Sequence, residues 1–90
     1  MRAIYMNKIL WEGYSKYDNA IVGVFNKPEL SLEACKRYLL DYFTEEELNK
    51  ELEKCKDKLE KGEDYIIKNN KIDYGISILA LNKDYSEFYN

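Results

Sequence analysis

Apolar residues cluster into short stretches near both ends of the chain and recur at helical spacing in its middle. Residues 3–11 contain Ile4, Ile9 and Trp11 with no strong break, and residues 20–25 (AIVGVF) are short, apolar and β-branched. Both stretches predict β-strands. The polar loop of residues 12–19 between them is short, so an antiparallel hairpin is the simplest arrangement.

Two helices are predicted next. In residues 28–42, Leu30, Ala34 and Tyr38 recur every four positions, Pro28 suits a first helical turn, and Asn26 is expected to cap it. In residues 45–61, Thr44 opens a capping box with Glu47, and Gly62 is placed to end the helix in a left-handed conformation. Glutamates at its start and lysines towards its end suit the helix dipole.

Residues 64–68 and 71–81 predict a second hairpin, with Asn69-Asn70 at its turn. Gly75 indicates either a bulge or a close contact within the second of these strands. The element order is therefore β-β-α-α-β-β, and we expect an α+β fold in which an antiparallel sheet carries both helices on one face. Residues 1–90 form a single domain, with residues 82–90 as a flexible or docking tail; the strand order is not predicted.

Histidine is missing from the sequence, which excludes Ser-His-acid and Cys-His catalytic arrangements. The sequence has two cysteines, Cys35 and Cys55, on the apolar stripes of the two predicted helices. A redox pair or a metal site is the functional interpretation, but metal sites need more ligands. We expect two free, buried thiols instead, and we expect neither an enzyme nor a bound cofactor or metal.

The formal net charge is −3, and lysine outnumbers arginine twelve to two. Direct nucleic-acid binding is therefore not expected, because the net charge of the chain has the wrong sign for binding phosphates and because few arginines are available as forked hydrogen-bond donors. No apolar run approaches the length of a membrane span, and the first residues lack a signal-peptide pattern. We expect a cytoplasmic protein without a membrane segment.

Aromatic residues are abundant, with nine Tyr, three Phe and one Trp. Several fall in otherwise polar segments, where helical or strand periodicity does not assign them to a core. Since Tyr and Trp combine a large contact area with a polar tip, they suit protein interfaces. The other interpretation is that they fold back to cover the sheet. We predict that the partner-binding residues are Trp11, Tyr14, Tyr17, Tyr85, Phe88 and Tyr89.

One apolar stripe on the second predicted helix has the 4-3-4 spacing of a coiled-coil seam. It spans less than two heptads, so it also suits a helix that lies on its own core. A homodimer could form through its members, Leu48, Leu52, Cys55 and Leu59.

The run from Lys8 to Gly13, the strand Val22-Gly23-Val24-Phe25 and a following helix with Ala34 together resemble a group of small bacterial and phage proteins of uncharacterised function. The resemblance covers roughly the first 40 residues and implies an α+β fold and a phage or mobile-element origin. In size and composition the chain is also similar to anti-defence inhibitors, including anti-CRISPR proteins, by analogy of class alone.

The sequence thus favours a non-catalytic protein–protein interaction module, such as a phage-encoded inhibitor of a host or defence protein of the CRISPR type. The alternative is an oligomeric protein that sequesters a nucleotide or another small ligand in an aromatic-lined pocket. A protein partner is expected in the first case.

Overall fold

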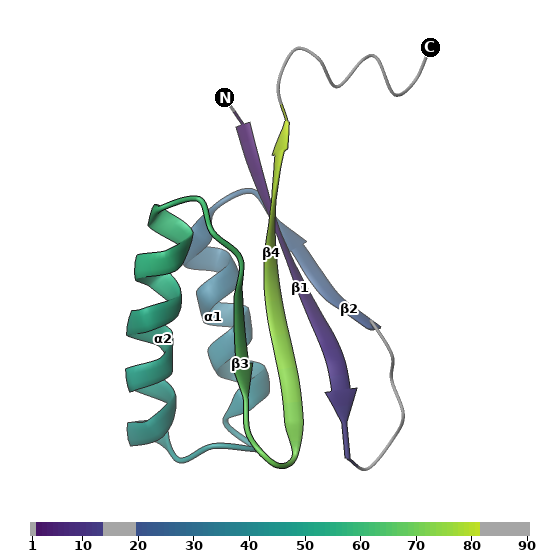
Figure 1. Ribbon diagram of the computed structural model, residues 1–90, viewed down its shortest axis with the longest axis vertical. Coiled ribbons are helices and arrows are strands. Elements are labelled where there is room, and N and C mark those ends of the chain that lie inside the picture. Colours follow the sequence, from purple (N-terminus) through teal and green to yellow (C-terminus); the bar gives the residue numbers. More distant parts are fainter. Residues whose placement is uncertain (1, 14–19, 82–90) are drawn as a thin grey trace.

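The predicted element order and fold class are both confirmed. The computed structural model describes residues 2–13 and 20–81, with only the backbone of Arg2, Ala80 and Leu81. Its two helices lie side by side along one side of the sheet (Figure 1). In chain order the elements are β1 (Arg2–Glu12), β2 (Ala20–Phe25), α1 (Pro28–Leu39), α2 (Glu45–Glu60), β3 (Tyr65–Lys68) and β4 (Ile72–Leu81).

The four strands form one antiparallel sheet in the order β2-β1-β4-β3. The first and last strands of the chain therefore pair in the centre, and each brings its own hairpin partner to an edge. Tyr5 lies opposite Phe25 on one side and opposite Ile78 on the other. The register shifts between Asn7 and Lys8 in the β1–β2 pair and between Ile9 and Trp11 in the β1–β4 pair.

Helix α2 has the ends that its sequence predicts. The backbone N–H of Glu47 donates to the Thr44 hydroxyl, and the Glu47 carboxylate accepts from the Thr44 N–H, which completes the capping box. At the other end Gly62 has φ +77°, while its N–H bonds to Leu59 O and the Glu63 N–H bonds to Lys58 O. This pair of bonds is a Schellman motif, which satisfies carbonyls at the helix end.

Helix α1 departs from the prediction at both ends. Its N-cap is Lys27, with no side-chain capping bond, so the expected capping by Asn26 is wrong. The helix ends at Leu39, three residues before the predicted end, because the N–H groups of Tyr42 and Phe43 both bond to Leu39 O and close a turn. Tyr42 therefore lies in the connection between the helices.

The core lies between the helices and the sheet. Cys35 and Cys55 are free and buried there, as the sequence predicted. The predicted seam on α2 also faces this core: Leu48, Cys55 and Leu59 are buried, and Leu52 packs partly buried against them. The chain uses this stripe for its own packing, and dimerisation through it stays a prediction. The buried apolar residues are Ile9, Cys35, Leu39, Leu48, Cys55, Leu59, Ile67, Ile72, Tyr74 and Ile76.

Candidate protein-binding face

The sheet face opposite the helices is a candidate binding surface. On β4, Ile72, Tyr74 and Ile76 are buried towards the helices. Because side chains alternate along a strand, the residues between them face the other way. Cross-strand neighbours extend this surface over all four strands. We call it the open face: Ile4, Met6, Lys8, Leu10, Trp11, Ile21, Val24, Ile66, Lys68, Asp73, Gly75, Ser77 and Leu79.

Large apolar side chains on the open face are exposed. Ile21 is 60% exposed, Val24 53% and Ile66 52%, and Leu79 and Trp11 are both above 40%. They come from all four strands, so the exposure covers the sheet from one edge to the other. Scattered exposed apolar side chains are ordinary on a soluble protein, but a contiguous set indicates a binding surface.

A shallow hollow of about 220 Å³ lies in this face, beside β3 and β4. Gly75 forms part of its floor: a Cβ atom there would lie 3.3 Å from Leu10 Cδ1 and 3.9 Å from Ile66 Cγ1. The close contact expected at Gly75 is therefore present, and the bulges lie elsewhere in the sheet. The missing side chain is what leaves room for the hollow.

Charges on the open face are few. Lys68 and Asp73 lie opposite each other at one end of the β3–β4 pair. Lys8 lies between Met6 and Leu10 on the central strand β1 and opposite Ile21. It forms no ion pair with any residue in the ranges 2–13 and 20–81. A cation therefore lies at the middle of the surface among apolar side chains, of which Ile21 is exposed and Met6 and Leu10 are half-buried.

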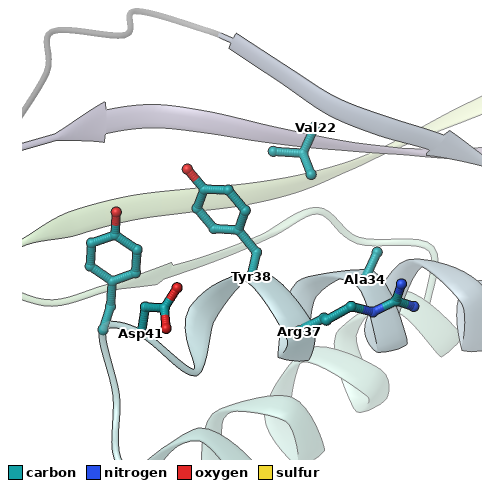
Figure 2. Close-up of a pocket in the computed structure, with 6 residues that line it drawn as sticks. Val22, Ala34, Arg37, Tyr38 and Asp41 are labelled. Atoms are coloured by element: carbon teal, nitrogen blue, oxygen red, sulfur yellow. The ribbon is translucent and has the colours of Figure 1, made fainter.

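A second hollow lies on the helical side, between the edge strand β2 and helix α1. We call it the β2–α1 groove; its volume is about 420 Å³. Figure 2 shows Val22 on one wall and Ala34, Arg37 and Tyr38 on the other, with Asp41 at one end. The rings of Tyr38 and Tyr42 stack with centroids 6.1 Å apart. Both hydroxyls donate hydrogen bonds to the buried carboxylate of Glu12.

The buried polar side chains are arranged for stability rather than for chemistry. The Asn7 amide donates to Ser31 O at 2.9 Å and to the Tyr74 hydroxyl at 2.8 Å, and the Ser31 hydroxyl donates to Asn7 Oδ1. All three residues are fully buried, so the Ser31 hydroxyl cannot reach a substrate. Within the described ranges every buried side-chain nitrogen and oxygen has a hydrogen-bond partner.

The two thiols are held in their neutral form. Burial, and secondarily the neighbouring Cys55, raises the pKa of Cys35. Burial, and secondarily Glu51, raises the pKa of Cys55 to about 12. Since the thiolate is both the nucleophile and the metal ligand, neither cysteine is poised for that chemistry. The part of the chain that the structure describes contains no group of three His, Cys, Asp or Glu side chains that could hold a metal ion.

Of the six predicted partner-binding residues, only Trp11 can be placed. It lies opposite Asp73 on the open face, and its ring lies against Gly13. The other five, Tyr14, Tyr17, Tyr85, Phe88 and Tyr89, lie outside the described residues.

Sequence reasoning missed Ile21, Val24, Ile66 and Leu79. For Ile21, Val24 and Leu79 the signal was present in the segments AIVGVF and ISILAL, which are apolar at both odd and even positions, and Ile66 lies beside Ile67 in the short strand YIIK. Such continuous runs are typical of strands that are covered on both faces. The helices cover only one.

Comparisons with family models, curated proteins and solved structures find no match to this chain. The resemblance to small phage proteins is thus neither supported nor opposed. None of the described helices is long and apolar enough to cross a membrane.

Proposed function

We propose that this chain is a non-catalytic protein–protein interaction module that binds one partner protein through the open face. The observation that carries the proposal is that five large apolar side chains, Trp11, Ile21, Val24, Ile66 and Leu79, are exposed on the same face of a sheet and come from all four of its strands. The composition of β2 and β4 supports it, because their apolar residues on both faces suit a sheet with a second covering layer.

The charge pattern of the open face defines the partner's chemistry. Lys8 lies among apolar side chains, and burying an unpaired ammonium group there would cost several kcal/mol. The partner therefore presents an apolar patch with a carboxylate near its centre, placed to accept a hydrogen bond from Lys8. A shared ion pair of this kind gives the interface its orientation and its selectivity.

Site-specific crosslinking tests where the partner binds. A photo-reactive residue replaces Ile21 or Leu79 on the open face, and Lys50 on the exposed side of α2 serves as the matched control. We expect both open-face positions to crosslink one and the same protein, and unlabelled chain to compete with that product. Equal labelling from Lys50 would contradict the assignment to the open face.

Binding measurements on the crosslinked protein then test the contacts. Ile66→Lys and Trp11→Ala should each weaken binding at least tenfold, because a truncated or charged anchor loses about 1.4 kcal/mol or more. Lys8→Glu should do the same, whereas Lys8→Arg should retain binding. All four changes lie on an exposed sheet face, so the melting temperature should stay nearly constant. Unchanged affinity in a folded Ile66→Lys, Lys8→Glu double variant would refute the proposal.

The sequence resemblance adds a narrower hypothesis, namely that the chain inhibits the partner protein that it binds. Once the partner is identified, its activity is measured with and without the purified chain. If the unaltered chain lowers the partner's activity and the Ile66→Lys variant does not, the result would support inhibition through the open face. If the partner keeps its full activity at a saturating concentration of the chain, the chain is an interaction module that does not inhibit.

A second candidate function rests on the β2–α1 groove. Its volume and the stacked tyrosines Tyr38 and Tyr42 suit a flat ring, as expected for a protein that sequesters a nucleotide or a similar small ligand. Thermal-shift measurements with purine and pyrimidine nucleotides test it, with Tyr38→Ala as the variant and Tyr65→Phe as the control. A stabilisation that Tyr38→Ala abolishes would favour this function; no shift with any nucleotide would remove it.

A further inference from the structure

A row of facing residues crosses the open face at the level of Gly75. Gly75 on β4 lies opposite Ile66 on β3 and opposite Lys8 on β1. Lys8 in turn lies opposite Ile21 on β2, so each strand contributes one position to the row. Because neighbouring strands lie about 4.8 Å apart, Ile66 and Lys8 stand roughly 10 Å apart, with only a glycine between them. The hollow of about 220 Å³ lies at this gap in the row.

The floor and one wall of the hollow are apolar. Leu10 leans over Gly75, since its Cδ1 atom lies 3.3 Å from the place that a Gly75 Cβ would take. Ile66 forms the wall on the β3 side and is 52% exposed. The facing wall is the side chain of Lys8, which has no ion-pair partner in the ranges 2–13 and 20–81. The hollow therefore combines an apolar bottom with a cation on its β1 side.

A carboxylate lies at another part of the rim. Asp64, which precedes β3, also lines the hollow, and its Oδ1 accepts a hydrogen bond of 2.9 Å from the Ile78 N–H. This bond holds an anion on the β3 side of the hollow. A second carboxylate is repelled there and attracted at Lys8. The two charges thus give the hollow a direction, with the place for a bound anion on the β1 side.

We propose that the hollow takes one aromatic side chain of the partner protein, while a neighbouring carboxylate of the partner binds Lys8. This inference rests on the proposed function, since it names the contact that the partner makes on the open face. The volume suits one ring: an apolar cavity of about 150 Å³ binds benzene, whereas pockets for small-molecule ligands measure about 300–1,000 Å³. A ring beside the Lys8 ammonium group also gains a cation–π attraction. Aromatic anchors of this kind are common among the residues that dominate protein interfaces.

Three short peptides test the chemistry of the hollow. Acetyl-Asp-Phe-amide carries both the ring and the carboxylate, acetyl-Asn-Phe-amide lacks the charge, and acetyl-Asp-Leu-amide lacks the ring. Each is titrated into the isotope-labelled full chain, and the amide chemical shifts are followed. We expect millimolar binding of the first peptide, which shifts the amides of Gly75, Lys8 and Ile66 and leaves those of α2 unchanged. The other two peptides should bind about threefold or more weakly than the first.

Filling the hollow from below should abolish this binding without a loss of stability. Gly75 does not have the positive φ of Gly62, so its backbone accepts a side chain, and Leu10 Cδ1 is the end of a flexible side chain that can give way. Gly75→Val should weaken binding of acetyl-Asp-Phe-amide about tenfold or more. The melting temperature should stay constant or rise, because glycine is unfavourable inside a strand. Gly75→Ala should give a smaller loss in the same direction, and it replaces the valine variant if that variant unfolds.

Two further variants locate the ring and the carboxylate. Ala34→Val enlarges a side chain in the β2–α1 groove and should leave the binding unchanged. Lys8→Gln should remove the preference for the Asp peptide over the Asn peptide. If Ala34→Val abolishes the binding and Gly75→Val does not, the ring lies against Tyr38 and Tyr42 and the proposal is overturned. Equal binding of the Leu peptide, or no shift at millimolar concentration, would also overturn it.

The chain itself offers the same chemistry in residues 82–90, where Asp84 precedes Tyr85 and Glu87 precedes Phe88. The full-length variant Tyr85→Ala, Phe88→Ala distinguishes this occupant from a partner protein. Unchanged affinity for acetyl-Asp-Phe-amide would support a partner's side chain as the occupant. Tighter binding of the peptide would show that the chain's own aromatic residues compete for the hollow, and it would overturn the assignment to a partner.

The crosslinking experiment separates a failure of this inference from a failure of the proposed function. Crosslinking from Ile21 and Leu79 detects a partner on the open face without involving the hollow. If the crosslinked protein binds the Gly75→Val variant with unchanged affinity, the aromatic anchor is overturned and the proposed function stands. If that affinity falls about tenfold or more while the variant stays folded, the anchor is supported. Peptide binding that Gly75→Val abolishes, without any crosslinked protein, would support the preference of the hollow and contradict the proposed function.

Discussion

Asn7 on β1 and Tyr74 on β4 are joined by a hydrogen bond of 2.8 Å inside the core, where both side chains are fully buried. The same amide group of Asn7 also bonds to the carbonyl of Ser31 on α1. One polar side chain therefore ties the two central strands to the first helix. It is one of the points at which the two layers of the fold are connected by directional bonds as well as by apolar packing.

Asn7→Ala should lower the free energy of unfolding by about 2–4 kcal/mol, because it leaves the buried Ser31 and Tyr74 hydroxyls without their partner and opens a cavity. Tyr74→Phe removes one hydroxyl and should cost less, about 1 kcal/mol. Urea denaturation of the two variants measures both values. A smaller loss for Asn7→Ala than for Tyr74→Phe would show that the amide is not the centre of this network.

Thr44→Ala should lower the free energy of unfolding by about 1 kcal/mol, because the Thr44 hydroxyl accepts from the Glu47 N–H at the start of α2. Thr44→Ser keeps the hydroxyl and should stay within a few tenths of a kcal/mol of the unaltered chain. The comparison uses chemical denaturation at neutral pH. Equal losses for the two variants would mean that the methyl group, and not the cap, matters at this position.

The same cap should make stability depend on acid pH. Hydrogen bonds from the Thr44 side chain and backbone lower the pKa of Glu47 below its ordinary value of 4.5. A carboxyl group with a depressed folded pKa stabilises the fold above the unfolded pKa and loses that effect as the pH falls through the folded pKa. The stability difference between the unaltered chain and Thr44→Ala should therefore shrink below about pH 4.5. A constant difference down to pH 3 would contradict the capping role of Glu47.

Cys35 and Cys55 should resist alkylation in the folded protein at neutral pH and react only on unfolding, because burial raises the pKa of both thiols. Replacing both by Ala should preserve partner binding while stability falls by about 1–3 kcal/mol through lost packing. Mass spectrometry after iodoacetamide treatment checks the first part. Rapid labelling of either thiol in the folded chain would show that it is accessible.

Alkaline stability follows from the same two thiols. A thiol whose folded pKa is raised stabilises the fold below its unfolded value of about 9 and loses that contribution as the pH rises towards its folded value. Unfolding free energy should therefore fall from about pH 9 upward, and less steeply in the Cys35→Ala, Cys55→Ala variant. Some dependence remains in that variant, since burial also raises the pKa of Tyr74 and of Tyr65.

Most elements of this fold are determined by local sequence. The apolar run of residues 20–25, the capping box at Thr44 and the glycine at the end of α2 each act through neighbouring residues, and the structure places them where the sequence predicts. The burial of Cys35 and Cys55 is local in the same sense, because helical periodicity alone puts them on the apolar side. Helix α1 is the exception at both ends: Asn26 has the right side chain for a cap but lies one residue too early, and the helix ends at Leu39 instead of Tyr42.

The tertiary structure alone decided which surfaces remain free. The order β2-β1-β4-β3 depends on the pairing of β1 with β4, which lie some 70 residues apart, and no local signal encodes such a pairing. That pairing makes β2 an edge and leaves Ile21, Val24, Ile66 and Leu79 together on the uncovered side of the sheet. A strand that is apolar on both faces can be recognised in the sequence. Which face the helices leave bare depends on how the whole chain packs, because two helices can cover only one side of a four-stranded sheet.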